Sequence, residues 1–420
     1  MNNRLAITLF QVFPEQVLKK LKSLGLSGGR ALPRQEARII ENIDHFETDE
    51  PKTKHALFSL SPNAWFTAVS EYPSIRHFNY CGLTYEIVRA LNLNGYVVDI
   101  VDLNHEHPVT KEYDIFIGHG GNCRTTLDQL PQGTPVFQYI SGAYWKAFSE
   151  ESRQRYDRFA KSRGISAPAT FRRDPTGYIG GEDYLLKRAD CLFTNRCPRM
   201  VAAFGEHQNH FFFTGLGAYP DKNLAIPPAD RDFEAGRRNF LYVGGTGGNI
   251  QKGMDVLLEA FAASPDLNLF IYCKVEDEIL QNYRRELNLP NIKYIYHLRY
   301  PWFRPKLKRL MKSFNFTVHV PLNSGVGTAF TGTLALGLIP VGYIDLPDFP
   351  DCTVLAADWQ VEAIRECLAD AARKTADWCG QASRKIVEAY DENYSIDAVR
   401  ARFTELFSDS NIARSRARRP

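Results

Sequence analysis

The segment NFLYVGGTGGNIQKGMDVLLEAFA (239–262) is the clearest structural signal in the chain. Residues 239–245 begin as an apolar strand and run into a glycine-rich turn, and residues 252–262 have the apolar spacing of an amphipathic helix. A strand that passes through a short turn into a helix is the building unit of a parallel α/β sheet. The segment therefore predicts an α/β fold, provided that similar units surround it.

Similar units do occur on both sides of this segment. Apolar strands are predicted at 56–60, 96–102, 113–118, 134–140, 190–195 and 210–215, and again at 267–273, 291–296, 314–320 and 338–344. Helices are predicted at 83–95, 252–262, 276–287, 303–313 and 328–336. Because these strands are continuously apolar, the sequence predicts parallel sheets covered by helices on both faces.

The length of 420 residues predicts more than one domain, because a typical domain has about 150 residues. Residues 220–238 (PDKNLAIPPADRDFEAGRR) contain three prolines and many charges, and they interrupt the strand–helix pattern. We therefore expect an N-terminal domain at 1–225, with an extension at 1–54, and a C-terminal domain at 226–408. Residues 409–420 are expected to form a basic, disordered tail.

The charge distribution argues against a nucleic-acid-binding protein. The net charge is +3, and the last ten residues carry four Arg and no acidic residue, so the rest of the chain has a net charge of −1. The Arg-rich tail could instead make a weak contact with an anionic membrane surface. The scattered cysteines, the lack of a long apolar run and a poor match to a signal peptide predict a cytoplasmic protein.

Two glycine-rich turns are candidates for binding phosphate. The first comprises Gly244, Gly245, Thr246 and Gly247, with Lys252 at the start of the next helix. Closely spaced backbone N–H groups and a lysine are suited to an anion, although a tight turn that binds nothing has the same composition. It matches neither the P-loop nor the G-x-G-x-x-G pattern.

The second turn also follows an apolar strand. It comprises Asn323, Ser324, Gly325, Val326, Gly327 and Thr328. Small residues here could surround an anion, or they could allow close packing of a helix on the sheet, which would also account for Gly332. With both turns in one half of the chain, a diphosphate is predicted to lie between them.

The C-terminal half resembles the donor-binding domain of GT-B glycosyltransferases, most of all the retaining family 4, or group 1, enzymes. The resemblance rests on FLYVGG…KGMDVLLEAFA, on PLNSGVG…LALGLIPVGY and on the final segment YSIDAVRARFTELF, and it covers roughly residues 235–405. It implies two Rossmann-like domains facing each other across a cleft, with the final helix returning to the first domain.

The resemblance assigns roles to only some residues. Lys252 matches the family lysine that contacts the donor diphosphate, whereas the neighbouring arginine of the family falls on Gly245. The two family glutamates fall on Ser324 and Gly332, and the second of these normally holds the ribose. The resemblance also implies retention of configuration at the sugar carbon.

In the N-terminal half, His119 follows an apolar strand and is the first candidate for a catalytic role, since a neutral imidazole can hydrogen-bond a sugar hydroxyl. A histidine that only ends a strand is the alternative. His77 and Asn79 are candidates for contact with the acceptor or the sugar, or members of an ordinary polar loop. No metal site is predicted, because Asp230-x-Asp232 lies in the linker.

Taken with the resemblance, these residues predict a glycosyltransferase. It would move a sugar from a nucleotide-diphosphate donor to a saccharide or lipid-linked acceptor, in surface polysaccharide synthesis, without a metal or other cofactor. The alternative is a non-catalytic GT-B relic that binds a sugar nucleotide or a partner protein, and an epimerase on the same fold is a third, more distant reading.

Overall fold

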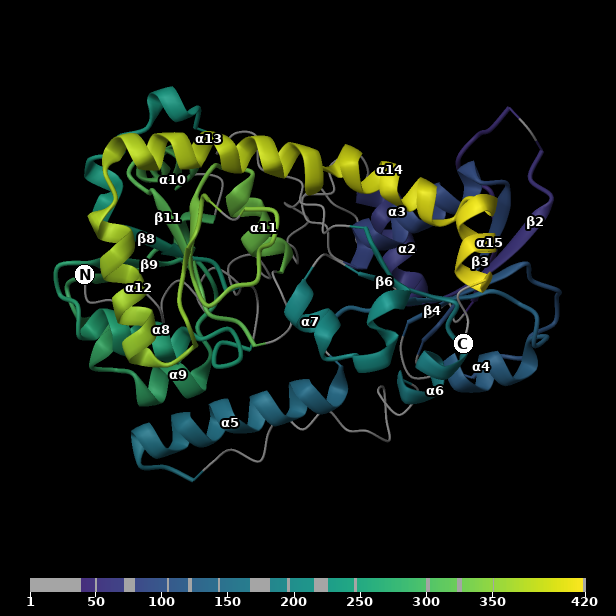
Figure 1. Cartoon of the computed structure of the whole chain (residues 1–420), viewed down its shortest axis with the longest axis horizontal. Coiled ribbons are helices and arrows are strands. Elements are labelled where there is room, and N and C mark those ends of the chain that lie inside the picture. Colours follow the sequence, from purple (N-terminus) through teal and green to yellow (C-terminus); the bar gives the residue numbers. More distant parts are fainter. Residues whose placement is uncertain are drawn as a thin grey trace, which may run out of the picture.

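The computed structural model describes residues 39–417, apart from 50, 72–79, 104–105, 120–122, 143, 167–181, 195–196, 215–225, 245–247, 300–302, 323–326 and 350. It contains two parallel β-sheets, each flanked by helices, and the two units lie side by side along the long axis of the molecule (Figure 1). We call the unit around the first sheet the N-terminal lobe and the unit around the second sheet the C-terminal lobe. The predicted fold class is confirmed.

The sheet of the N-terminal lobe has the order β1-β3-β2-β4-β5-β6-β7. Its strands are β1 (Ile39–Ile43), β2 (Lys54–Ser59), β3 (Tyr96–Val101), β4 (Ile115–Gly118), β5 (Val136–Tyr139), β6 (Cys191–Thr194) and β7 (Phe211–Phe213). All pairs are parallel except β1 with β3. The sequence did not predict β1, because this edge strand buries little of its surface and lacks a continuous apolar run.

Short helices cover the first sheet. They are α2 (Pro62–Glu71), α3 (Tyr80–Leu93), α4 (Cys123–Gln129), α6 (Glu182–Arg188) and α7 (Pro198–Ala202), with the 3₁₀ helix η1 (Gly205–His210). The buried face of α3 carries Ile87, Val88 and Leu91, which are fully shielded and belong to one apolar cluster with Phe58 of β2. The expected pairing of a strand at 96–102 with a helix before it is therefore confirmed.

The sheet of the C-terminal lobe is entirely parallel and has the order β10-β9-β8-β11-β12-β13. Its strands are β8 (Asn239–Tyr242), β9 (Asn268–Ile271), β10 (Ile292–Tyr294), β11 (Phe316–His319), β12 (Ile339–Gly342) and β13 (Val354–Leu355). The helices are α8 (Met254–Ala262), α9 (Asp277–Asn282), α10 (Arg304–Met311), α11 (Thr328–Leu334), α12 (Val361–Arg373) and α13 (Ala376–Asn393). Short 3₁₀ helices lie at η2 (Pro228–Asp230), η3 (Ala235–Arg238), η4 (Glu286–Asn288) and η5 (Tyr296–Arg299).

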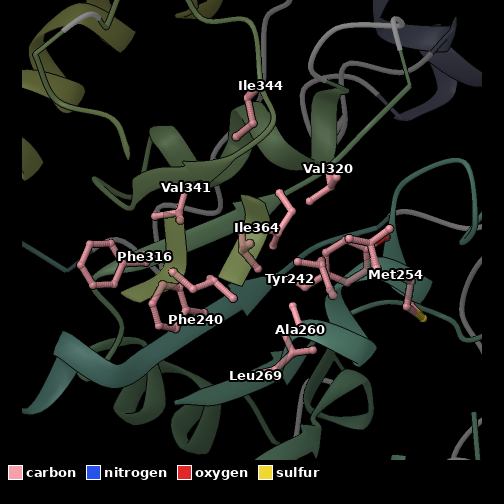
Figure 2. Packing of buried hydrophobic residues seen from close by; sticks show 14 of the residues in the cluster. Phe240, Tyr242, Met254, Ala260, Leu269, Phe316, Val320, Val341, Ile344 and Ile364 are labelled. Carbon is pink, nitrogen blue, oxygen red and sulfur yellow. The ribbon is translucent and has the colours of Figure 1, made fainter. Parts of the chain in front are cut away.

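The core of this lobe fills the space between the sheet and helices α8 and α12. Figure 2 shows Phe240 and Phe316 from neighbouring strands lying together, and their rings stack with centroids 5.0 Å apart. Figure 2 also shows Tyr242 of β8 close to Met254, the first residue of α8. The core therefore holds the end of β8 and the start of α8 in fixed positions on either side of the first glycine-rich turn.

Each lobe also receives a helix from the other part of the chain. The long helix α5 (Trp145–Arg163) extends beneath the C-terminal lobe, and α13 continues into α14 (Ile396–Leu406), which lies on the N-terminal lobe (Figure 1). Phe159 of α5 is part of the C-terminal core, and Phe403 of α14 is part of the N-terminal core. The predicted return of the final segment is confirmed, whereas the sequence did not predict the docking of α5.

The prediction of a disordered tail is wrong for most of its length. Residues Asp409–Ala417 form helix α15, and Ile412 packs into the N-terminal core. Lys54 at the start of β2 forms an ion pair with Asp409, at 2.6 Å. Ile412 and this ion pair attach α15 to the N-terminal lobe. The prediction failed because the segment is mostly polar, as disordered chain ends are.

Candidate functional site

The strand order of the C-terminal lobe places both glycine-rich turns at one point. From β8 the chain crosses to β9 and β10 on one side, and later returns to β11 on the other side, so that β8 and β11 are neighbours. In open parallel sheets, ligands bind at the carboxyl ends of strands where the order reverses in this way. The backbone N–H of Leu322, after β11, donates to the carbonyl oxygen of Gln251, after β8, at 2.9 Å. The segments that lead out of the first turn and into the second are therefore adjacent.

The first turn is partly occupied by a carboxylate of the protein itself. Residues 245–247 lie outside the described residues, so the roles predicted for Gly245, Thr246 and Gly247 stay predictions. The next two N–H groups, those of Gly248 and Asn249, donate to the carboxylate of Glu276, at 2.9 and 2.7 Å. These two donors are satisfied without a ligand. Gly244 precedes them, and a Cβ there would lie 2.7 Å from the hydroxyl oxygen of Tyr242.

Lys252 lies at the end of this turn, one residue before the cap of α8. Gly253 has a φ of +76°, and a Cβ there would lie 2.5 Å from the carbonyl oxygen of Val320. Glycine is therefore required for the close approach of the turn to the end of β11. Burial lowers the pKa of the Lys252 ammonium, and the nearby Cys273 and Glu276 partly oppose this shift. A partly desolvated ammonium at a strand end interacts with anions more strongly than one in open water.

The second turn is described only at its end. Asn323, Ser324, Gly325 and Val326 lie outside the described residues. Gly327 is exposed and precedes α11, where its carbonyl oxygen accepts from the N–H groups of Phe330 and Thr331, each at 3.0 Å. Thr328 is half-exposed at the first position of the helix. A Cβ at Gly332 would meet no atom within 4 Å, so helix packing does not require glycine there, contrary to the alternative considered above.

A cationic side chain that the sequence did not identify lies between the two turns. Arg155 of α5 is fully buried, and its Nη2 donates to the carbonyl oxygen of Pro321 at 3.2 Å. Its Nη1 lies 3.1 Å from the position that a Cβ of Gly253 would take, and its guanidinium carbon lies 4.5 Å from the centre of the Trp359 ring. Within the described part of the chain, Nε and Nη1 of Arg155 have no hydrogen-bond partner. Burial lowers the pKa of this guanidinium to about 10, so it is still charged at neutral pH.

His319 at the end of β11 is a second buried polar group of this region. It is 4% exposed, its ring stacks on Phe330, and its Nδ1 has no partner among the described residues. Burial lowers its pKa to about 3, and the positive charges of Lys252 and Arg155 contribute to this shift. The imidazole is therefore neutral at pH 7. The region combines two cations with one neutral imidazole, which is an environment for an anion.

Nothing in the sequence of α5 marks Arg155 as different from its neighbours. The segment WKAFSEESRQRYDRFAKSR alternates acidic and basic residues, as solvent-exposed helices do. The one available signal is the spacing of Phe148, Ser152, Tyr156 and Phe159, which defines a buried face. Arg155 lies within that face, three residues after Ser152 and four before Phe159. Glu276 was missed because it acts through a hydrogen bond to a loop 28 residues earlier in the chain.

His119 occupies the corresponding place in the N-terminal lobe. It follows β4, which pairs with β2 where the strand order of that sheet also reverses. The side chain is 3% exposed, and its Nδ1 lies 3.3 Å from the carbonyl oxygen of Tyr139. This contact orients the ring whether or not it has a chemical role. The catalytic role of His119 therefore stays a prediction, and His77 and Asn79 lie outside the described residues.

Neither a metal cluster nor a membrane-spanning helix is found in the described residues. No group of three His, Cys, Asp or Glu side chains is placed there to hold a metal ion. None of the described helices combines the length and the apolar character needed to cross a bilayer. A cavity of about 590 Å³ lies between the linker segment 229–234 and α13, and its lining does not include the residues of the two turns.

Comparison with solved structures identifies the architecture. Sucrose-phosphate synthase from Thermosynechococcus elongatus aligns with a TM-score of 0.56 and 13% identity, over 84% of this chain and 98% of that one. The fold is that of the GT-B glycosyltransferases. Anabaena HepE, in complex with UDP and glucose, aligns with a TM-score of 0.49 and 11% identity, over 85% of this chain and 99% of that one. An α,α-trehalose-phosphate synthase from Burkholderia xenovorans gives 0.49 and 11%, over 84% and 99%. No protein-family model and no curated protein matches the chain.

Proposed function

We propose that this GT-B protein transfers a sugar from a nucleoside-diphosphate donor to a saccharide or lipid-linked acceptor, in the synthesis of a surface polysaccharide. The observation that carries the proposal is the desolvated ammonium of Lys252 at the carboxyl end of β8, where the strand order reverses. A departing diphosphate gains negative charge as its bond to the sugar breaks, and a positive charge beside that bond stabilises it. The sequence resemblance gives the same lysine the same role.

In the proposed reaction, the bond between the sugar carbon and the phosphate oxygen breaks, and the electron pair stays on the diphosphate. An acceptor hydroxyl oxygen forms the new bond to the sugar carbon, and its proton passes to an oxygen of the departing diphosphate. Lys252 stabilises the charge that accumulates on the diphosphate, and no metal ion is required by this scheme. His119 would hydrogen-bond the sugar from the N-terminal lobe. Retention of configuration is what the family resemblance suggests.

The alternative is a relic that binds a sugar nucleotide or a partner protein without catalysis. Two observations favour it. The family glutamates are replaced by Ser324 and Gly332, and the carboxylate of Glu276 already occupies the N–H groups of Gly248 and Asn249. Both leave fewer groups for the donor than the family pattern provides. A relic that binds a sugar nucleotide would keep the role proposed for Lys252 and differ from the enzyme in turnover.

The location proposed for the reaction is the cytoplasmic face of a membrane, where lipid-linked acceptors are found. Helix α15 exposes Arg414 and Arg416, which could contact anionic lipid. Because the rest of the chain has no basic excess, this contact would be weak.

The experiment that tests the proposal has two stages. Isothermal titration calorimetry with UDP-, ADP- and GDP-sugars first shows whether a donor binds, and product analysis with saccharide acceptors then shows whether a sugar is transferred. Binding with turnover supports the enzyme. Binding without turnover favours the relic, and no binding of any nucleotide sugar contradicts both.

A further inference from the structure

We propose that Arg155, from helix α5 of the N-terminal half, is the second cation of the donor diphosphate site and takes the place of the arginine that the chain lacks at Gly245. The proposal rests on the function proposed above, because it assumes that a diphosphate binds between the two turns. It assigns a ligand contact to a residue that lies 166 positions before its hydrogen-bond partner Pro321.

The position of the guanidinium is the first argument. Nη2 contacts the residue that opens the second turn, and Nη1 lies beside Gly253, which closes the first turn. An anion held near Pro321 and Gly253 therefore lies near this guanidinium. Any side chain at Gly253 would crowd Nη1, so the glycine also makes room for the guanidinium.

The unsatisfied state of the guanidinium is the second argument. Arg155 is fully buried, and among the described residues Nε and Nη1 have no hydrogen-bond partner and no carboxylate forms an ion pair with it. Asp255 and Glu151 attract it from a distance, while Arg158 repels it. The carboxylate with the larger of these effects, that of Asp255, is already paired with Arg158 at 2.9 Å. An unpaired buried charge is costly, and proteins keep such groups where a ligand pairs with them.

The choice of a diphosphate over other anions follows from the number of cations. Arg155 and Lys252 both influence His319 electrostatically, so both charges act on one small region. A diphosphate carries enough negative charge for two cations, and the planar guanidinium can donate two parallel hydrogen bonds to phosphate oxygens. His319 is neutral there and can donate or accept one further hydrogen bond.

The test compares wild type with Arg155→Met, which keeps an unbranched apolar stem as far as the position of Nε and removes the charged guanidinium. Calorimetry is carried out with UDP, ADP, GDP, the corresponding nucleosides and inorganic pyrophosphate. We expect Arg155→Met to weaken binding of the preferred nucleoside diphosphate by about 10- to 100-fold, and to leave the affinity for its nucleoside unchanged. Arg153→Ala is the matched control, because Arg153 lies on the exposed face of α5 and pairs with Glu150 and Asp157 of the same helix.

The melting temperature separates this role from a structural one. If Arg155 binds a ligand, Arg155→Met removes an unpaired buried charge, so the ligand-free variant melts at the same temperature as wild type or higher. If Arg155 only holds α5 against Pro321 and Trp359, the variant melts lower and binds the diphosphate as wild type does. The second result overturns the inference.

The same titrations distinguish failure of the inference from failure of the proposed function. Equal diphosphate affinity in wild type and Arg155→Met overturns the inference alone. Binding of pyrophosphate that depends on Arg155, with no binding of any nucleoside diphosphate, overturns the proposed function and supports the anion site. No binding of any of these probes to wild type overturns both.

Discussion

Replacing Arg158 with Met should destabilise the protein by removing the partner of a buried carboxylate. The Asp255 side chain is fully buried, and its Oδ2 lies 2.9 Å from Nη1 of Arg158, which reaches it from α5. Its other oxygen has no hydrogen-bond partner among the described residues. Arg158 also contacts Glu259, which Arg163 pairs at 3.1 Å. This group of ion pairs attaches α5 to α8 of the C-terminal lobe.

The expected loss in the free energy of unfolding is about 3 kcal/mol at pH 8. Removing one partner of a buried ion pair costs about 3–5 kcal/mol, and the 16% exposure of Arg158 places this pair at the lower end. Burial already raises the pKa of Asp255 in the folded state, and loss of Arg158 raises it further. A carboxyl group whose pKa is higher in the folded than in the unfolded protein lowers the stability at pH values above its folded pKa. It has no such effect below its unfolded pKa of about 4. The loss of stability caused by Arg158→Met should therefore shrink as the pH falls from 8 towards 5.

Urea unfolding at pH 8 and pH 5 measures both effects. The double variant Arg158→Met with Asp255→Asn should be more stable at pH 8 than Arg158→Met alone, since it no longer buries an unpaired charge. Arg153→Ala on the exposed face of α5 is the control and should leave the urea midpoint unchanged. The stability losses of Arg158→Met and Asp255→Asn are also measured separately. If their sum equals the loss of the double variant within about 0.5 kcal/mol, the reasoning is refuted.

Three further predictions concern the site. Lys252→Ala should weaken donor binding by about 1.5–3 kcal/mol, the size of a charge-assisted hydrogen bond, and an unchanged affinity in calorimetry would make Lys252 a structural residue. His119→Ala should slow turnover while the circular dichroism spectrum stays native, and a normal rate would exclude the role. Gly253→Ala should lower the melting temperature, because its Cβ would lie 2.5 Å from the carbonyl oxygen of Val320 at a φ of +76°; an unchanged melting temperature would show that the turn can move.

The sequence predicted the parts of the fold that depend on local patterns. Strands β2 to β12 were predicted because each lies in an apolar run, whereas β13 was missed because it is only two residues long. The positions of the two glycine-rich turns after β8 and β11 indicated that the strand ends before them are neighbours. Strand β1 was missed because an edge strand buries few side chains, and α15 because one residue, Ile412, attaches it to the core. These elements are stabilised by a small number of long-range contacts that leave no periodic signal.

The candidate site was predicted only as far as backbone and local charge define it. Lys252 was found because it stands next to a glycine-rich turn, and its desolvation agrees with a role in anion binding. Arg155 and Glu276 were not found, since their importance comes from contacts with residues distant in the sequence. The first glycine-rich turn was expected to offer free N–H donors to an anion. Instead, the carboxylate of Glu276 accepts hydrogen bonds from the N–H groups of Gly248 and Asn249 at the end of that turn.

If the proposal for Arg155 holds, helix α5 supplies a positive charge to the proposed donor site. Arg155 and Arg158 are three positions apart on α5 and therefore lie on one face of the helix. Arg158 and Arg163 pair with carboxylates of the C-terminal lobe, which fixes the helix, whereas Arg155 reaches further in and keeps two nitrogen atoms free of partners. The ion pairs of Arg158 and Arg163 are enough to attach the helix. They do not explain why a further arginine, Arg155, is buried near the end of β11 without a carboxylate partner among the described residues. The arrangement is accounted for if docking of α5 places one positive charge beside Gly253 and Pro321, where the proposed diphosphate would bind.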